Sequence, residues 1–469
     1  MKVKVQVVIE AENGDTKVVQ EVALLERDRL QSETLGLNLK EAKTLLQGVQ
    51  HAFAQQQIQE YLQQQSTCDD CGQKRYRKDE REIIYRTLFG RLHLRSPRFY
   101  RCQCQPQPTR TFSPLAKLLT ERTAPERLYL ESKFASLMSY GLTTKLLEEV
   151  LPLEGEVNAA TIRNHLHQVG QRLEDELGDE QAMFASGCEQ EWEKLPRPEL
   201  PLTVGIDGGY VHACHQPSKQ SGWFEVIVGK SITADGDSKC FGLVNGYDQK
   251  PKRRLFELLK SQGMQMNQQI TFLSDGGDTV RELQLYLNPQ AEHLLDWFHI
   301  TMRLTVMNQM VKGLGTKKSQ LCAQALKDLE RIKWYLWHGN IFRALQIIED
   351  LDLTLDDGNL TPEQRKLLKS VREFQTYIEN NSSFIPNYGE RYRSGERIST
   401  GFVESTVNQV ISKRFVKKQQ MQWTQRGAHL LLQVRTRVLD DELESTFRRW
   451  YAPFRQACQE LGNDIELAA

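Results

Sequence analysis

Two stretches of the sequence follow one pattern: residues 202–213 read LTVGIDGGYVHA, and residues 269–278 read QITFLSDGGD. Each is an apolar run typical of a buried strand, and each includes an acid followed by two glycines. Glycine after the acid leaves room for backbone or a ligand to approach closely. Because ligands of open α/β sheets gather at the carboxyl ends of the strands, we expect Asp207 and Asp275 to be neighbours at one sheet edge.

The segments around these stretches alternate between strand and helix patterns. Residues 223–232 and 241–246 indicate two further strands, residues 251–264 a helix, and residues 291–299 (AEHLLDWFH) another strand that ends in an acid. Three meandering strands followed by alternating helix and strand is the order of a ribonuclease-H-like α/β core. We therefore predict a multidomain α+β protein with such a catalytic core.

Two strand-end acids suit metal-dependent phosphodiester chemistry. A pair of divalent cations can activate the nucleophile, relieve the charge on the phosphate and stabilise the leaving oxygen. Mg²⁺ prefers carboxylate oxygens, so several carboxylates must converge on one cleft. Strand-end aspartates also cap helices and turns, and Asp278 with Glu282 fits such a cap. We interpret Asp278 as the cap and Asp275 as the metal ligand.

Residues 401–415 (GFVESTVNQVISKRF) have the pattern of an amphipathic helix that carries Glu404. Its predicted buried stripe consists of Val403, Val407, Val410 and Ile411. A basic cluster follows, made of Lys413, Arg414, Lys417 and Lys418. Such a cluster can hold the DNA backbone beside a cut site. Lysine is also favoured by the dipole at a solvated helix end, so both interpretations remain open.

Four motifs in order, GIDGG, FLSDGGD, LLDWFH and GFVESTVNQVISKRFVKKQQMQWTQRGAHLLLQVR, resemble the DDE transposases of bacterial insertion sequences. The resemblance is nearest to the Kra-type family and more distant to Mutator-like elements. It covers residues 141–438 well and the N-terminal part more loosely. It implies that Asp207, Asp275 and Glu404 are the catalytic acids, which hold two Mg²⁺ or Mn²⁺ ions.

The same resemblance assigns roles to the region between the second and third acids. Asp296 and His299 match a D-x-x-H signature, which implies that they support the site. His299 could then hydrogen-bond a phosphate or a metal-bound water, although a histidine packed on the core at a helix start would read the same. The helical stretch 300–387 would be an insertion into the core.

The implied function is that of an insertion-sequence transposase. It binds the terminal repeats of double-stranded DNA, cleaves the element ends and joins them to target DNA, without a small-molecule cofactor. Synapsis of two ends implies a homo-oligomer. A metal-dependent nuclease without strand transfer is one alternative, and a non-catalytic DNA-binding regulator derived from a transposase is another.

Four of the nine cysteines cluster: Cys68, Cys71, Cys102 and Cys104. The spacings C-x-x-C and C-x-C can build a four-thiolate zinc site in a small ribbon-like module, although the second spacing is less usual and four free thiols are the alternative. The strands between them are basic and suggest a DNA-facing surface formed by Lys74, Arg75, Arg77, Lys78, Arg95, Arg98 and Arg101. A metal would supply folding energy to a module too small to build a core.

Residues 139–172 have the pattern of a helix-turn-helix. Its second helix, beginning near Thr161, would expose Arg163, Asn164 and His167 to the major groove of DNA. Helical pairs are common without any role in DNA binding, so the pattern is informative only beside a transposase-like core.

The predicted segments follow from these patterns. They are an N-terminal hairpin and helix (1–66), a zinc-ribbon-like module (67–110), a helix-turn-helix region (111–195), the first part of the core (196–300), a helical insertion (301–395), the completion of the core (396–440) and a C-terminal helix (441–469). The formal net charge is zero, which counts mildly against DNA binding but does not exclude it, because local patches decide phosphate contacts. No apolar run approaches the roughly 18–20 residues of a membrane span, and the N-terminus lacks a signal core, so we expect no membrane association and a cytoplasmic, nucleoid-associated protein.

Overall fold

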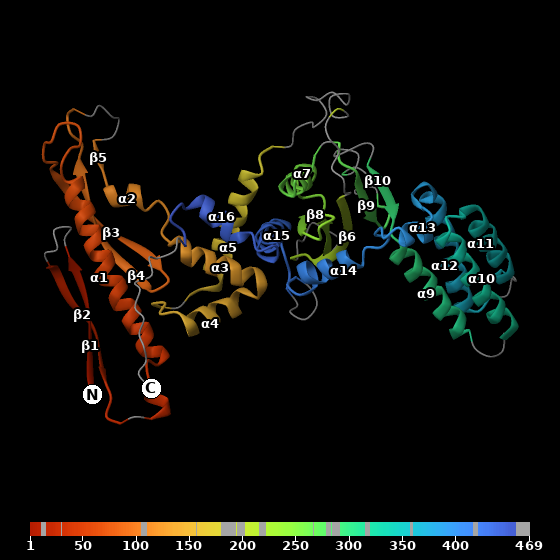
Figure 1. Cartoon of the computed structure of the whole chain (residues 1–469), viewed down its shortest axis with the longest axis horizontal. Coiled ribbons are helices and arrows are strands. Elements are labelled where there is room, and N and C mark those ends of the chain that lie inside the picture. Colours follow the sequence, from red (N-terminus) through yellow and green to blue (C-terminus); the bar gives the residue numbers. More distant parts are fainter. Residues whose placement is uncertain are drawn as a thin grey trace. The chain divides into compact units, whose positions relative to one another are not determined.

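The computed structural model describes residues 1–10, 16–29, 31–104, 110–155, 157–179, 194, 202–214, 222–265, 267–277, 283, 291–314, 319–356, 360–415 and 421–455. The chain is a mixed α+β protein with several sheets (Figure 1). It divides into two compact units, one of Met1–Val169 with Asp441–Ala469 and the other of Gly170–Asp440. Among the described residues, no helix combines the length and the apolar character that a bilayer span requires.

The first unit begins with the predicted hairpin and helix. Strands β1 (Lys2–Glu10) and β2 (Thr16–Glu26) pair antiparallel. Helix α1 (Leu39–Gln65) follows, and its start is fixed by a capping box in which the Asn38 side chain accepts from the Glu41 amide. The pattern of these first residues therefore predicted the local structure correctly.

A three-stranded antiparallel sheet comes next, in the order β3-β4-β5. Its strands are β3 (Arg77–Thr87), β4 (Gly90–Tyr100) and β5 (Thr111–Phe112), and the short helix α2 (Pro114–Leu118) follows. Sheet and helices share a small apolar core of Ala54, Ile83, Leu92, Leu94 and Leu115. This module therefore packs against α1 and does not stand alone as a free ribbon.

Three helices follow in sequence: α3 (Pro125–Leu137), α4 (Tyr140–Val150) and α5 (Ala159–Glu176). Glu131 of α3 is fully buried and bonds both Arg127 and His165. The C-terminal helix α16 (Leu443–Trp450) returns to α3, where the rings of Phe447 and Tyr129 meet edge to face at 5.3 Å. The aromatic contacts and the buried ion pairs hold this helical group together.

A five-stranded sheet forms the centre of the second unit. Its strands are β6 (Leu202–His212), β7 (Trp223–Ile232), β8 (Ser238–Val244), β9 (Ile270–Ser274) and β10 (Glu292–Leu295). The order is β10-β9-β6-β7-β8, with β6, β7 and β8 antiparallel and β9 and β10 parallel to β6. The predicted meander and the two later strands are thus confirmed, and β9 joins the meander at its first strand.

Helices cover both faces of this sheet. Helix α7 (Pro251–Ser261) packs on the face formed by Leu202, Val204, Ile206, Phe241 and Leu243. Helix α14 (Gly401–Val407), the π-helical turn Asn408–Ser412 that continues it, and α15 (Gln425–Leu439) lie on the other face. A side chain on a strand of this sheet therefore faces either α7 or the α14–α15 layer, with a period of two.

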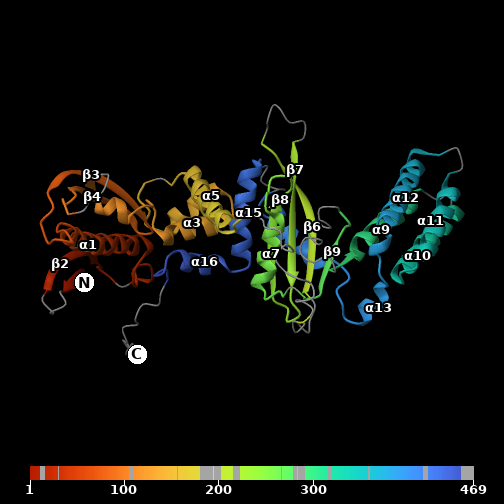
Figure 2. The ribbon, with the colours of Figure 1, turned by 90° about the horizontal axis from the view of Figure 1, so that it is seen from above.

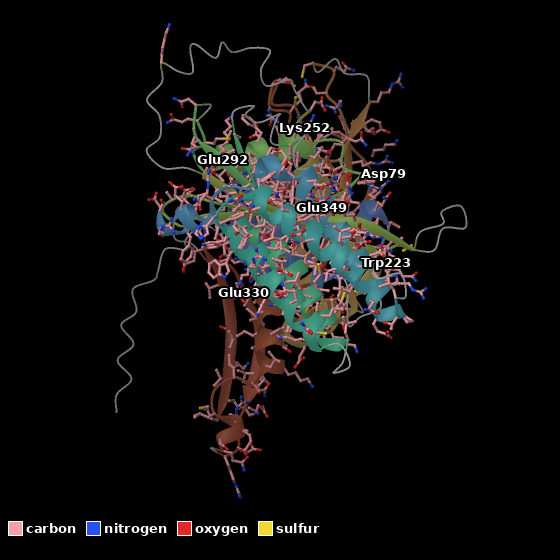
Figure 3. The ribbon with its side chains drawn as sticks, turned by 90° about the vertical axis from the view of Figure 1, so that its right-hand side faces the viewer. Asp79, Trp223, Lys252, Glu292, Glu330 and Glu349 are labelled. Atoms are coloured by element: carbon pink, nitrogen blue, oxygen red, sulfur yellow. The ribbon has the colours of Figure 1, made fainter. Side chains whose placement is uncertain are left out.

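The segment between β10 and α14 is a separate helical group beside the β10 edge of the sheet (Figure 2). Its helices are α9 (Trp297–Gly313), α10 (Ser319–Trp337), α11 (Ile341–Leu355), α12 (Pro362–Asn380) and α13 (Tyr388–Arg393). They share a continuous apolar core, while charged residues such as Glu330 and Glu349 are exposed (Figure 3). The stretch predicted to be a helical insertion is therefore helical.

Candidate functional site

Three parallel strands place acids in one row. Asp275 and Asp296 directly follow β9 and β10, whereas Asp207 lies in the middle of β6 and not at its end as predicted. The hydrogen-bond register joins Gly205 of β6, Leu273 of β9 and Leu294 of β10. Two positions further along each strand stand Asp207, Asp275 and Asp296. The Asp296 amide donates to the Ser274 carbonyl at 2.8 Å, so the ladder between β9 and β10 continues to this row. Because side chains alternate with a period of two, the acids share the face that their register partners share.

Helix α14 lies on that face. Gly205 and Gly209 flank Asp207 on the same side of β6, and a Cβ at Gly205 would lie 2.2 Å from Val403. A Cβ at Gly209 would lie 3.0 Å from an atom of the π-helical turn. The two glycines therefore let the helix approach the strand closely, and Asp207 faces the turn of helix that carries Glu404.

The pKa shifts of Asp207 and Glu404 also indicate that these acids lie close to one another. Burial raises the pKa of Asp207, the charges of Asp275 and Asp296 add to that rise, and His299 opposes it. Burial also raises the pKa of Glu404, the charge of Asp207 adds to it, and His299 again opposes it. The sheet thus brings the three predicted catalytic acids and the two predicted supporting residues into one electrostatic cluster.

The three carboxylates do not form one tight cluster. The carboxylate oxygens of Asp207, Asp275 and Glu404 do not all lie within 4.8 Å of one another. Asp207 and Glu404 are half-buried and Asp275 is exposed, so the group is open on one side. Two ions about 3.5–4 Å apart would need ligands spread around both, so a single tight cluster of oxygens is not required.

Asp296 has a structural task within this row. It is fully buried, caps α9 by accepting from the Phe298 amide at 2.9 Å, and accepts from the Thr400 amide at 3.0 Å. The Thr400 hydroxyl donates to its second oxygen. The Thr400 carbonyl accepts from the Glu404 amide at 3.0 Å, so Asp296 fixes the start of α14. His299 Nε2 lies 3.6 Å from Asp296 Oδ2, on the side of the acids.

The helical group adds residues that the sequence did not single out. The Arg303 guanidinium lies 4.2 Å above the ring of Tyr377. Burial raises the pKa of Tyr377, and the charge of Asp275 adds to that rise. A Cβ at Gly276, where φ is +92°, would meet the Asn381 side chain at 2.3 Å. Arg303 follows His299 by one helical turn, so its place near the acids could have been predicted from the sequence. Nothing in the sequence indicates that α12 lies close to the Asp275 loop.

The predicted basic cluster after Glu404 is only partly on the surface. Lys413 is exposed, while Lys417 and Lys418 lie outside the described residues. Arg414 is 2% exposed, and its guanidinium lies 5.1 Å above the ring of Trp423. Arg414 is therefore buried and packs on Trp423, whereas the prediction placed it among the surface cations.

The four clustered cysteines of the first unit do meet. The sulfurs of Cys68 and Cys104 are 3.6 Å apart, those of Cys71 and Cys102 are 3.3 Å apart, and all four lie within 4.8 Å of one another. Zinc–sulfur bonds of about 2.3 Å in a tetrahedron place sulfurs roughly 3.8 Å apart. The backbone of Asp70 lowers the pKa of the Cys68 thiol to about 7, which favours the thiolate. The cluster can therefore bind a metal, and zinc fits it.

A second group of metal-type ligands, Glu174, Asp248 and His429, also lies within 4.8 Å. Here the Arg254 guanidinium bonds Glu174 at 2.9 Å and Asp248 at 2.9 Å. Burial alone would raise the pKa of Glu174, but the hydrogen bond with His429 and the charge of Arg254 lower it to about 2. Although these ligands could hold a metal, Arg254 already bonds both carboxylates, and the group reads as a buried ion-pair network.

The predicted DNA-reading helix begins at Ala159, two residues before Thr161. Arg163 and Asn164 are exposed on it, while His167 is half-buried. Opposite them, Ile162 and Leu166 are fully buried. Two of the three predicted contact residues are thus available to a partner, and the helix keeps the amphipathic face that its pattern indicated.

No protein-family model matches the chain, and no curated protein is detectably similar to it.

Proposed function

We propose that the chain is a DDE-type transposase in which Asp207, Asp275 and Glu404 carry metal-dependent cleavage and joining of DNA. The observation that carries this proposal is the register row of Asp207, Asp275 and Asp296 on the face of the sheet that α14 covers. The strand order β10-β9-β6-β7-β8, with its antiparallel meander and parallel outer strands, supports a ribonuclease-H-like core. The motif resemblance supplies the reaction class, and the geometry supports the choice of residues.

The residues of the chain divide the work. Asp207, Asp275 and Glu404 would hold two divalent cations, which supply charge relief on the phosphate and an activated nucleophile when bound. Asp296 positions Glu404 through Thr400. His299 sits beside the acids, where its ring can donate to a phosphate oxygen.

The reaction has two displacements. Water attacks the phosphorus at the element end, the bond to the 3′-oxygen breaks, and that oxygen leaves as a 3′-hydroxyl. The 3′-hydroxyl then attacks a phosphodiester of the target, and a target 3′-hydroxyl leaves. No covalent link to the protein forms, so no nucleophilic serine or tyrosine is required.

A strand-transfer assay with element ends and target DNA in Mg²⁺ tests the proposal. Asp207→Asn, Asp275→Asn and Glu404→Gln should each lose activity roughly a thousandfold or more, because each removes several kcal/mol of transition-state stabilisation. Asp235→Asn, at an exposed position in the turn between β7 and β8, is the matched control and should keep full activity.

Two outcomes would change the assignment. If the three variants joined DNA as well as the wild type, these acids would not be the catalytic ones. If cleavage depended on them but no joined product formed with any target, the chain would be a metal-dependent nuclease.

A further inference from the structure

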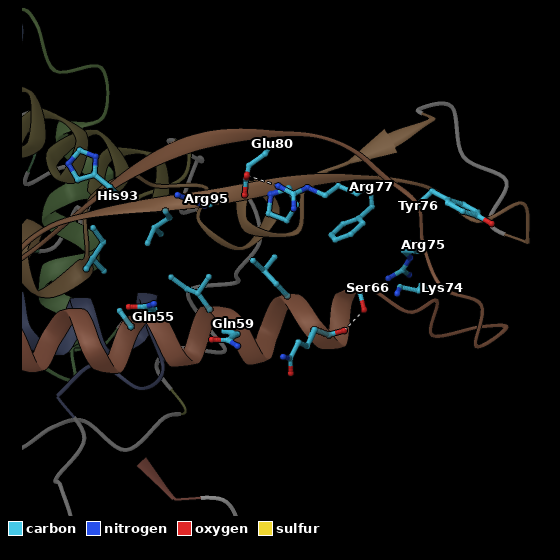
Figure 4. A pocket seen from close by; sticks show the side chains of 18 of the residues that line it. Gln55, Gln59, Ser66, Lys74, Arg75, Tyr76, Arg77, Glu80, His93 and Arg95 are labelled. Atoms are coloured by element: carbon cyan, nitrogen blue, oxygen red, sulfur yellow. Dashed lines mark hydrogen bonds and ion pairs between the residues drawn. The ribbon is translucent and has the colours of Figure 1, made fainter. Parts of the chain in front are cut away.

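A groove of about 1200 Å³ runs between α1 and the β3–β4 sheet of the first unit (Figure 4). Its lining residues belong to α1, β3, β4 and the turn before β3, and they include neither the acids of the row nor the exposed residues of α5. Its floor is apolar and consists of Ala54, Ile58, Leu62, Leu92 and Leu94. We propose that this groove binds a single strand of DNA, with the bases turned towards the helix and the phosphates along the cationic wall.

The helix wall offers hydrogen bonds at regular intervals. Gln55, Gln59 and Gln63 line the groove and are exposed, and they repeat every four residues beside the apolar row of Ile58 and Leu62. Residues four apart lie one above the other on a helix, so the amides form a ladder along the groove. Glutamine amides both donate and accept, which suits the edges of unpaired bases.

The strand wall supplies positive charge. Lysine and arginine line the groove at four positions against a single acid, Glu80. Arg75 is buried and bonds backbone carbonyls, and Arg77 pairs with Glu80. Lys74 and Arg95 are exposed, and both face the groove. This surplus of cations favours an anionic ligand over an apolar peptide.

An aromatic ring stands at one end of the groove. Tyr76 is 82% exposed and lies next to Lys74 and Arg75 (Figure 4). A tyrosine with so much of its ring in water is a stacking platform for a base. An apolar floor, amides, cations and an exposed aromatic ring together form the combination with which proteins hold unstacked bases.

The shape favours a single strand over a duplex. The lined part of α1 runs from His51 to Ser66, which at a 1.5 Å rise is about 22 Å. That length accommodates a short run of unstacked nucleotides. In a duplex the base faces are stacked and the paired edges are occupied, so an apolar floor and an amide ladder would have little to contact.

The test is fluorescence anisotropy of the full chain, loaded with zinc, with a short labelled single strand of DNA of mixed sequence. The same sequence as a duplex and as RNA are the comparison probes. The single DNA strand should bind at least tenfold more tightly than the duplex. Tyr76→Ala and the pair Gln55→Ala with Gln59→Ala should each weaken binding roughly tenfold. The pair Lys74→Ala with Arg95→Ala should lower the salt slope by about 1.4.

Matched controls lie on the same elements outside the groove. Gln57→Ala on α1 and Arg81→Ala on β3 are exposed substitutions of the same chemistry and should leave the affinity unchanged. Equal affinity for duplex and single strand, or equal losses in groove and control variants, would overturn the proposal. Tighter binding of RNA would show that the ligand class is wrong.

This site is independent of the proposed catalytic acids. Asp207→Asn should leave single-strand binding intact, and the groove variants should leave metal binding by the acids intact. A failure of one proposal is therefore visible without a failure of the other.

Discussion

The thiol cluster of the first unit and the acidic row of the second unit are both sets of metal-type ligands, yet they are assembled in opposite ways. One pair of cysteines comes just before β3 and the other just after β4, at the open end of this β-hairpin, and all four sulfurs are already within 4.8 Å of one another. The three acids come from positions 207, 275 and 404, and a sheet with two helical layers brings them together. The first site is built by a few residues, and the second by a whole core.

This difference predicts how each site depends on its metal. The thiols lie on turns outside the regular strands, so we expect bound metal to hold them together. Asp207 lies on a strand and Asp275 directly after one, while Glu404 lies on α14, so the packed core holds the acids in place despite their mutual repulsion. Removal of metal should therefore disorder the thiol turns but leave the structure around the acidic row unchanged.

The largest effect is expected at the thiol cluster. Structural zinc contributes about 10–16 kcal/mol of apparent binding free energy at pH 7, and Cys71→Ser removes one ligand. We expect loss of one zinc per chain and loss of hydrogen-exchange protection at the Cys68 and Gly72 amides, which bond within this turn. Metal analysis and hydrogen exchange measure both.

Cys322→Ser is the matched control, because Cys322 is a half-buried thiol on α10 outside the cluster. It should keep the zinc and the protection of the turn. A wild-type chain that bound no zinc when expressed with it, or a Cys71→Ser variant with unchanged zinc content, would show that the cluster is four free thiols.

The next effect concerns the link between the row and the helix above it. Thr400→Val removes the hydroxyl that bonds Asp296 but keeps the backbone bond. We expect DNA cleavage to fall about 10–100-fold, the usual cost of losing a partner that orients a metal ligand. Asp296→Ala should cost more, because it leaves the amides of Phe298 and Thr400 without an acceptor.

A stability effect must be separated from a positioning effect here. Thr361→Ala removes the cap of α12 and should cost about 1 kcal/mol of stability without any change in activity. If Thr400→Val lost stability to the same extent but kept full cleavage, Asp296 would be a structural cap alone. Restored cleavage in Thr400→Ser, which keeps the hydroxyl, would support positioning.

The acidic row also shows what the sequence could and could not predict. The strand–acid–Gly-Gly pattern placed Asp275 correctly at a strand end, but Asp207 lies inside β6, which continues to His212. The patterns predicted the strands but not their order in the sheet. The register that adds Asp296 to the row depends on pairing between distant strands, which no local pattern encodes. The contact of Thr400 with Asp296 spans 104 positions and was invisible for the same reason.

The misplacement of Arg414 has a different cause. In a regular helix of about 3.6 residues per turn, Arg414 would lie on the side of Val403 and Val407, which belong to the predicted buried stripe, and not beside Lys413. The turn at Asn408–Ser412 is π-helical, and Arg414 lies just after it and is buried. Arg435 donates to the carbonyls of Gln409 and Val410 in this turn, so a residue from α15 stabilises the irregularity. The prediction grouped Arg414 with the neighbouring lysines by charge, whereas its helical spacing from Val403 and Val407 already indicated a buried position.

The smallest expected effect is a change in stability, which tests whether repulsion among the acids destabilises the folded state. The folded-state pKa of Asp207 is raised, so the charged carboxylate destabilises the fold at neutral pH and its protonation relieves that cost. In buffer without Mg²⁺, Asp207→Asn should raise the free energy of unfolding at pH 7 by on the order of 1 kcal/mol. The gain should shrink as the pH falls through the folded-state pKa and vanish below the unfolded value of about 3.9.

Thermal melts of both proteins from pH 4 to pH 8 measure this difference, with Asp235→Asn as the neutral control. Mg²⁺ should stabilise the wild type more than Asp207→Asn, since the cation relieves the same repulsion. A variant that is less stable than the wild type at every pH would mean that Asp207 makes a favourable contact in the metal-free fold. The acidic row would then resemble the Arg254 network, in which a cation of the protein already bonds the carboxylates. It would not be an open site that binds added cations.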